Sequence, residues 1–169
     1  MTPDEKAKLQ FSKILTYANG YRELSMFKEA LEELSRLPLK YASHSKTLQM
    51  KLSIFFDAKD WKAAECTAKE IAMREPNDPG NFINLAYATR RAKTVRKANA
   101  ILLTAVDRFP NEAIVHYNLA CYACLENELE SAKARLVKSI ALDPKFLNTA
   151  KADEDLSPLS EWLQNLEIA

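Results

Sequence analysis

Apolar and small side chains along this chain recur three or four residues apart, in blocks separated by short polar turns. Such spacing places them on one face of an α-helix, so each block predicts an amphipathic helix. A turn near Lys93 separates two of these blocks, and the second block stops at the sequence Arg-Phe-Pro. The first block carries Phe82, Leu85, Ala86 and Thr89, and the second carries Val95, Ala98, Ile101, Leu102 and Ala105.

The two-helix pattern repeats along the chain at a step of 34 residues. In one unit, Asp78 and Pro79 form a helix start with a capping acid and a proline in the first turn. A small residue recurs where two helices are expected to cross closely. The step is carried by Ala30, Ala64, Ala98 and Ala132, and by Pro76, Pro110 and Pro144. A fixed period of this length indicates stacked structural repeats.

This pattern resembles the tetratricopeptide repeat family, whose unit is a helix–turn–helix of about 34 residues. The resemblance rests on the pairs Leu85-Ala86 and Leu119-Ala120, the alanine of each second helix and the closing proline. It implies an all-α fold, an α-α superhelix (solenoid) of tandem helix–turn–helix repeats with a C-terminal capping helix. We expect one domain over residues 1–169, with repeats at about 11–44 (irregular), 45–78, 79–112 and 113–146, and a cap at 147–169.

The N-terminal part departs from the regular pattern. Pro38 comes earlier than the period predicts, so we expect an irregular connection between the first two repeats. The glycine that usually forms the turn inside each repeat is also absent. Its place is taken by Ser25, Lys59, Lys93 and Asn127, of which Asn127 best tolerates a left-handed backbone.

Both ends of the chain carry helix-start signals. Thr2 and Glu5 match a capping box, which predicts a long first helix from about Pro3 to Glu23. Near the other end, Ser157 and Pro158 predict the start of a capping helix whose apolar side chains cover the last repeat. These side chains are Leu159, Trp162, Leu163 and Leu166.

Composition favours a globular protein and argues against several classes. Of the 169 residues, 47% are hydrophobic and 28% are charged, which is typical of a globular chain. No apolar run approaches the ~18 residues needed for a membrane span. The acidic pair Asp4-Glu5 does not resemble the start of a signal peptide. We therefore expect a cytoplasmic protein without membrane contact.

Charge is distributed unevenly along the C-terminal half. Residues 77–111 carry six basic and two acidic side chains, a balance of +4, and residues 112–169 carry five basic and ten acidic ones, a balance of −5. A basic segment beside an acidic one can attract an acidic ligand or a nucleic acid. No nucleic-acid recognition motif accompanies the run RRAKTVRKA, and a solvated turn is its simpler interpretation. RNA binding is therefore a lesser alternative.

Cys121 and Cys124 have the spacing of a thiol redox pair or of half a zinc site. They fall in the middle of a predicted helix, and neither Cys66 nor His116 has the spacing of a further zinc ligand. A reduced pair packed within a helix is the favoured interpretation. His116 is expected to pack as Phe82 does one repeat earlier. A thiol redox or zinc protein remains an alternative.

Motifs of common enzyme classes are absent, including the nucleophile elbow, the Walker loop and the zinc-protease motif. Acidic pairs such as Asp153 and Asp155 fall on predicted caps or polar faces. We expect no catalysis, no metal and no cofactor.

The resemblance implies that the first helices of the repeats line a concave groove, which binds an extended peptide or a helix of a partner. Carried over position by position, it gives eleven candidate peptide-binding residues. These are Gln49, Met50, Ser53, Ile83, Asn84, Tyr87, Arg90, Arg91, Tyr117, Asn118 and Cys121. The expected function is that of a protein–protein interaction module or scaffold. A bacterial secretion-type or assembly chaperone is the alternative, and the sequence indicates no oligomeric state.

Side-chain chemistry suggests how these residues act. Asn84 and Asn118 recur at the 34-residue step, and each amide can hold a peptide backbone unless it forms only local bonds. Tyr87 and Tyr117 offer flat contact area of the kind found at binding hot spots. Arg90 and Arg91 favour a ligand that is acidic in part. We expect Asn84 and Tyr117 to be at least partly exposed.

Overall fold

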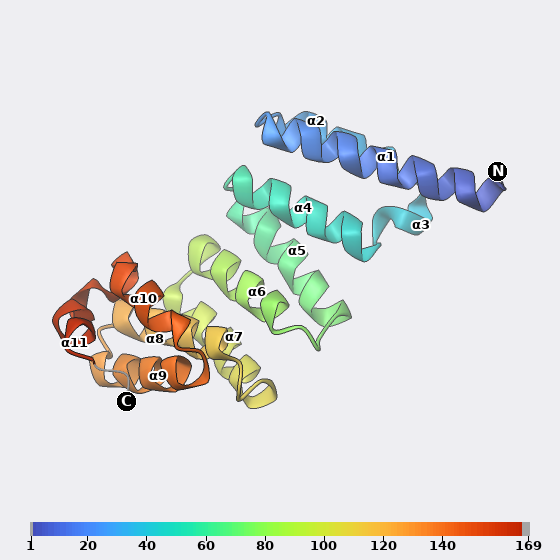
Figure 1. Cartoon of the computed structure of the whole chain (residues 1–169). Coiled ribbons are helices and arrows are strands. Elements are labelled where there is room, and N and C mark those ends of the chain that lie inside the picture. The colour runs from blue at the N-terminus through green and yellow to red at the C-terminus, as the bar shows by residue number, and fades with distance from the viewer. Residues whose placement is uncertain (1, 167–169) are drawn as a thin grey trace. The chain divides into compact units, whose positions relative to one another are not determined.

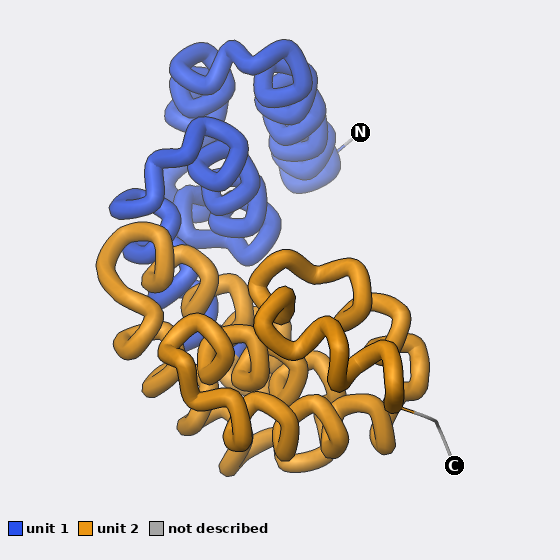
Figure 2. The backbone as a smooth tube through the Cα atoms, turned by 90° about the vertical axis from the view of Figure 1, so that its left-hand side faces the viewer, with its two compact units in different colours: residues 1–75 blue, residues 76–169 orange. Residues whose placement is uncertain are grey.

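The structure, a computed structural model, describes residues 2–166 and is helical, with no strand in that range. The chain forms two compact units, residues 1–75 and 76–169 (Figure 2). The all-α prediction is confirmed, and Figure 1 shows helices following one another as antiparallel neighbours within each unit.

The first unit contains two packed helix pairs. The pairs are α1 with α2 and α4 with α5, as the 34-residue period predicts, and α1 and α2 also contact α4. Their shared core includes Ile14 and Ala18 of α1, Ala30 and Leu34 of α2, and Ile54 of α4. The elements are α1 (Pro3–Glu23), α2 (Phe27–Ser35), α3 (Leu39–Ala42), α4 (Ser45–Asp57) and α5 (Trp61–Arg74).

The connection between the two pairs is irregular, as Pro38 predicted. Pro38 begins the single turn α3, and the Tyr41 ring at its end stacks on Phe11 with centroids 4.5 Å apart. The Thr47 hydroxyl donates to the Tyr41 carbonyl oxygen at 2.8 Å. The His44 Nδ1 accepts from the Lys46 N–H at 3.2 Å and so caps α4. Side-chain contacts therefore fix a segment that lies outside the repeat period.

The N-terminal capping box is present as predicted. The Glu5 N–H donates to the Thr2 hydroxyl at 3.2 Å, and the Thr2 N–H donates to the Glu5 carboxylate at 2.6 Å. These two bonds satisfy backbone donors that have no partner inside the helix.

The second unit contains two further helix pairs and a C-terminal segment. Helices α5, α7 and α9 end at Arg74, Arg108 and Leu142, each two residues before a periodic proline, so the predicted helix breaks are confirmed. The elements are α6 (Pro79–Ala92), α7 (Val95–Arg108), α8 (Ala113–Leu125), α9 (Leu129–Leu142), α10 (Lys145–Ala152), the 3₁₀ helix η1 (Glu154–Leu159) and α11 (Ser160–Gln164).

Three of the four turns that lack glycine adopt the left-handed backbone. The φ angles are 59° at Ser25, 56° at Lys59 and 62° at Asn127. Lys93 instead has φ −137° and ψ −100°. The Asp78 carboxylate caps α6 by accepting from the Gly80 N–H at 2.8 Å, as the sequence predicted.

The C-terminal segment, residues 145–166, closes the core of the second unit. Leu156, Leu159 and Leu163 are buried in that core, and Trp162 and Leu166 pack against it, so the predicted covering role is confirmed. The predicted helix start at Ser157 is wrong. Asp153 instead caps η1 by accepting from the Asp155 N–H at 2.9 Å, and α11 follows only after this 3₁₀ helix. Asp153 comes earlier in the chain than Ser157, its carboxylate accepts from a backbone N–H, and its negative charge is favourable at a helix N-terminus.

A helix long and apolar enough to cross a membrane does not occur among the residues that the structure describes.

Candidate functional site

An accessible stripe of polar and aromatic side chains runs along α6. Asn84, Tyr87 and Arg91 lie three and four residues apart, so they share one face of the helix. Tyr87 is 38% exposed and Arg91 is exposed, whereas Asn84 is half-buried. The Arg91 guanidinium lies 5.7 Å from the centre of the Tyr87 ring, a cation–π distance that orders both side chains. Ile83, on the same helix, packs against the core of the second unit.

Arg90 points to the C-terminal segment and forms a two-pronged ion pair with Asp155. Its two terminal nitrogens donate to the two carboxylate oxygens at 2.5 and 3.0 Å. The guanidinium also lies 5.7 Å from the centre of the Tyr122 ring. The hydrogen bond to Asp155 raises the pKa of Arg90 above its ordinary value. The positive charge of Arg90 is therefore already balanced within the chain.

Asp153 occupies the α8 side of the same surface. One carboxylate oxygen accepts from the Tyr117 hydroxyl at 2.6 Å and lies 3.7 Å from the Cys121 sulfur, whose thiol donates to it. The other oxygen caps η1 through the Asp155 N–H. Tyr117 and Cys121 are only 6% and 4% exposed, so the expectation that Tyr117 is at least partly exposed is wrong. The physical reason is that the C-terminal segment folds over α8.

An open cleft of about 810 Å³ lies between α6 and the C-terminal segment. One wall carries the aromatic ring and two guanidinium groups of α6. The other wall carries the carboxylates of residues 153–155, and we call this three-residue segment the acidic turn. The lining residues are Tyr87, Arg90, Arg91, Thr149, Ala152, Asp153, Glu154 and Asp155. Glu154 is exposed, while the carboxylates on either side of it bind α8 and α6.

The two recurring asparagines differ in their surroundings. The Asn118 amide donates to the Ile114 carbonyl oxygen one turn earlier at 2.8 Å, so this side chain forms a local bond. No hydrogen bond of the Asn84 side chain occurs among residues 2–166. Of the two, Asn84 is therefore the one that remains available to a ligand.

His116 is buried, as predicted. Its Nε2 lies 2.8 Å from the Pro110 carbonyl oxygen, and its Nδ1 lies 3.3 Å from an Arg135 nitrogen. These contacts account for the polar atoms of the ring within the core.

The remaining three candidates lie on α4, in the first unit. Gln49, Met50 and Ser53 are all half-buried. Met50 packs against the core of that unit, and the Ser53 hydroxyl donates to the Gln49 carbonyl oxygen at 3.1 Å. Part of each side chain thus serves the first unit itself.

The cysteines are free thiols. Cys121 and Cys124 are buried and Cys66 is exposed. Burial, followed by the nearby aspartates, raises the pKa of the Cys121 thiol, and burial also raises that of Cys124. Both shifts favour the protonated thiol, the opposite of what a redox nucleophile requires. No group of three potential metal-binding side chains occurs within the part of the chain that the structure describes.

The sequence prediction of the site did not include the acidic turn or Thr149. The signal that pointed to the turn was the charge difference between residues 77–111 and 112–169, which the structure shows as a contact between Arg90 and Asp155.

Comparison with known proteins identifies the fold. No protein-family model matches the chain, and no curated protein matches it in sequence. Among solved structures, MamA 41-end from Desulfovibrio magneticus RS-1 has a TM-score of 0.66 at 17% identity, covering 78% of this chain and 75% of that one. The MamA RS-1 ArsTM double mutant has a TM-score of 0.66 at 15% identity, covering 90% and 89%. YrrB, described as a TPR protein with an unusual peptide-binding site, has a TM-score of 0.61 at 14% identity, covering 91% and 78%. The chain has the fold of tetratricopeptide repeat proteins.

Proposed function

We propose that this chain, with its tetratricopeptide-repeat fold, is a protein-interaction module that binds a peptide segment or a helix of a partner and performs no catalysis. The observation that supports this most is the open cleft of about 810 Å³ beside α6, whose wall presents Tyr87 and Arg91. YrrB, which has a similar fold, is described as having a peptide-binding site. The three free thiols favour a reduced compartment, and we place the module in the cytoplasm.

The proposed contact surface centres on α6. Tyr87 is exposed enough to pack against a ligand, and a tyrosine provides a large contact area at a small cost in side-chain entropy. Asn84 can both donate to and accept from a peptide backbone. Arg91 adds positive charge to this stripe. Together the three side chains bind backbone, apolar and acidic groups of one extended segment.

The α8 part of the predicted groove is not open to a ligand. Tyr117 and Cys121 are covered by Asp153, and Leu156 behind them is fully buried. Removing Leu156 from the core would expose an apolar side chain at a cost of about 1.5–3 kcal/mol, in addition to the lost polar contacts. We therefore propose that a partner binds α6 and the outer rim of the acidic turn, and leaves the C-terminal segment in place.

The charge of the cleft limits which partners fit. Asp155 balances the charge of Arg90, and Arg91 is the other guanidinium group that lines the cleft and faces an acidic group of the partner. The exposed Glu154 on the opposite wall repels a second acidic group and attracts a basic one. A segment with one acidic side chain towards α6 and a neutral or basic one towards the acidic turn fits best.

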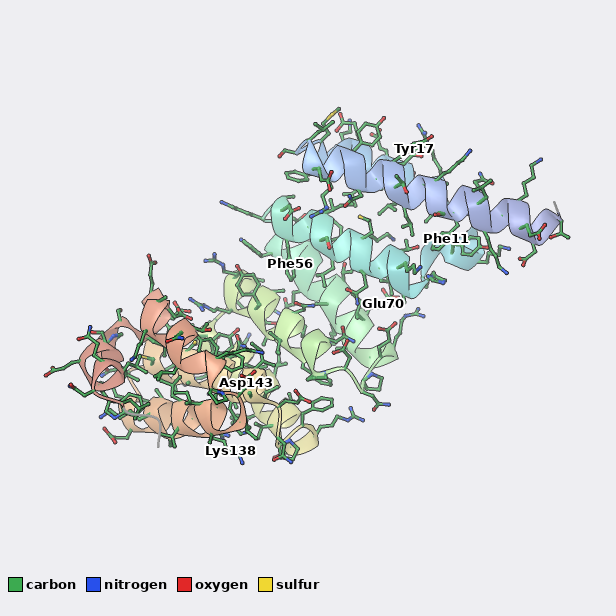
Figure 3. The ribbon with its side chains drawn as sticks, in the orientation of Figure 1. Phe11, Tyr17, Phe56, Glu70, Lys138 and Asp143 are labelled. Atoms are coloured by element: carbon green, nitrogen blue, oxygen red, sulfur yellow. The ribbon has the colours of Figure 1, made fainter. Side chains whose placement is uncertain are left out.

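Affinity capture from an extract of the native cells tests the proposed function. The immobilised parent protein should retain a specific partner, and Tyr87→Ala should retain much less of it. Lys138→Ala changes an exposed residue that projects from α9, and it serves as the matched control (Figure 3). Equal retention of the same partner by the parent and Tyr87→Ala, together with loss in Lys138→Ala, would move the binding surface away from α6.

A further inference from the structure

Helix α1 presents an exposed apolar face, of which only Tyr21 also packs against the core of the first unit. Tyr17 is 57% exposed and Leu24 is 71% exposed. With Thr16, Gly20 and Tyr21 they line a mainly apolar depression of about 370 Å³. Tyr17 lies on the side of α1 away from α4, whereas Phe11 lies on the side that faces α4 (Figure 3).

The repeat period identifies this face as one that packs between helix pairs. Steps of 34 residues from Gly20 lead to Ile54, Ala88 and Tyr122, and all three are buried. Ile54 packs into the core formed with the preceding pair, α1 and α2, and the Tyr122 ring contacts Arg90 of the preceding first helix, α6. By the same step, the Gly20 face of α1 is the face on which a preceding helix pair would stack.

Gly20 itself has no intramolecular reason to be glycine. Its φ is not positive, and a Cβ at this position would have no atom within 4 Å beyond its neighbours in the helix. A glycine inside a helix destabilises it relative to alanine. The chain holds only one other glycine, Gly80, so a glycine at this helical position calls for an explanation. Close approach of another molecule to this face provides one.

We propose that the Gly20 face of α1 binds the same face of a second copy of this chain, in an antiparallel pair of α1 helices related by a two-fold axis. In such a pair, each surface must supply both the protruding and the receiving group. Tyr17 and Gly20 are one turn apart on the same face, so the two-fold axis places each Tyr17 ring over Gly20 of the other copy. The depression lined by Thr16, Tyr21 and Leu24 receives the ring.

Charge along α1 favours the antiparallel arrangement. The arrangement brings Lys13 towards the C-terminal end of the other α1, where the Glu23 carboxylate and the helix dipole are negative. A parallel pair would instead place Lys13 beside Lys13. The contact involves one helix from each copy and is smaller than a permanent dimer interface. We therefore expect reversible association with a dissociation constant on the order of 10 µM.

Sedimentation equilibrium of the full chain, from about 1 µM to about 500 µM, brackets the expected dissociation constant and tests the proposal. The parent should convert from monomer to dimer over this range. Gly20→Gln fills the depression, and because no atom lies near this position, the monomer should unfold at the same or a higher temperature while dimerisation weakens at least ten-fold. Tyr17→Glu should have the same effect on the dimer.

Leu39→Glu is the control, because Leu39 is an exposed apolar residue of the same unit that lies outside this face. It should dimerise as the parent does. A parent that stays monomeric throughout, a parent that forms open-ended oligomers, or a dimer that persists in both Gly20→Gln and Tyr17→Glu would overturn the proposal.

Discussion

Arg90 of α6 and Asp155 of η1 are 65 residues apart in the chain and are joined by two side-by-side hydrogen bonds of 2.5 and 3.0 Å. This pair links the accessible face of α6 to the segment that closes the core. Asp155 belongs to the acidic turn, and Asp153 of the same turn accepts a hydrogen bond from Tyr117 of α8. The acidic turn thus divides the predicted ligand surface into a part on α8 that is occupied and a part on α6 that is open.

Breaking the Arg90–Asp155 pair should destabilise the second unit. Asp155→Asn removes the charge while keeping the shape, and it leaves a half-buried guanidinium without its carboxylate. We expect the free energy of unfolding to fall by about 1–3 kcal/mol. Urea denaturation followed by circular dichroism measures this value. Glu154→Gln makes the same chemical change at the exposed neighbouring residue and should change stability by less than about 0.5 kcal/mol. Equal effects of the two variants would contradict a structural role for the pair.

The second unit should lose stability in alkaline solution. Burial, the largest cause, raises the pKa of Cys121 above its ordinary 9.0 and that of Tyr117 and Tyr122 above their ordinary 10.0. Each group is neutral when protonated, so below the ordinary value neither the folded nor the unfolded chain loses a proton. Above it the unfolded chain releases protons that the folded chain holds, and stability falls as pH rises.

Urea midpoints measured between about pH 7 and pH 10.5, a range that spans the ordinary thiol and phenol pKa values, should be flat at first and then decline. Cys121→Ser should make the decline shallower between about pH 9 and pH 10, because one of the titrating groups is gone. A midpoint that does not change up to pH 10.5 would show that these groups titrate alike in the folded and unfolded chains.

Tyr122→Phe should leave the protein as stable or make it more stable. The Tyr122 hydroxyl is buried and has no hydrogen-bond partner among the described residues. Removing a hydroxyl in this state relieves its desolvation cost, so we expect a gain of about 0–2 kcal/mol. Tyr117→Phe is the matched comparison and should be destabilising, because its hydroxyl donates to Asp153. The unfolding temperature should fall in Tyr117→Phe and should stay the same or rise in Tyr122→Phe. A loss of stability in Tyr122→Phe would point to an ordered water at that hydroxyl.

The effect of a glycine substitution on stability should depend on the φ angle at each turn inside a repeat. Lys59 has φ 56°, a conformation that is strained for a lysine, so Lys59→Gly should stabilise the protein by up to about 1 kcal/mol. Asn127→Gly should gain less, because asparagine tolerates this region. Lys93 has φ −137°, and Lys93→Gly should be neutral or destabilising because it only adds freedom to the unfolded chain. Equal gains at Lys59 and Lys93 would contradict the described turn conformations.

Most of the fold could be predicted from the repeat period. Helix breaks, the central alanine of each second helix and the irregular connection at Pro38 follow from local helix signals and from the 34-residue step. The left-handed turn at Asn127 followed from its side chain. The same conformation at Lys59 is set by the helices on either side rather than by the lysine, which disfavours it.

The site was only partly predictable, because the C-terminal segment lies outside the period. The step placed Tyr117 and Cys121 in the groove, at the positions that Ile83 and Tyr87 hold one repeat earlier. Nothing in the step indicated that Asp153 would cover Tyr117. This docking depends on the packing of Leu156 and its neighbours into a core formed by distant parts of the chain. Local sequence patterns do not predict such packing. The charge difference between the two chain segments was interpreted as a means of attracting an acidic ligand or a nucleic acid, whereas Arg90 pairs with Asp155 of the same chain.

Calorimetric titration of the captured partner into the parent and its variants tests the central claim, that the open face of α6 binds a partner segment. Asn84→Ala and Tyr87→Ala should each weaken binding by about 1–3 kcal/mol, the usual range for an interface anchor or a lost polar pair. Their urea midpoints should change little, because Tyr87 is exposed and Asn84 makes no hydrogen bond among the described residues. Lys69→Ala and Lys138→Ala, at exposed positions outside this face, should bind as the parent does. Parent-like binding by both α6 variants, together with lost binding in either lysine variant, would contradict the claim.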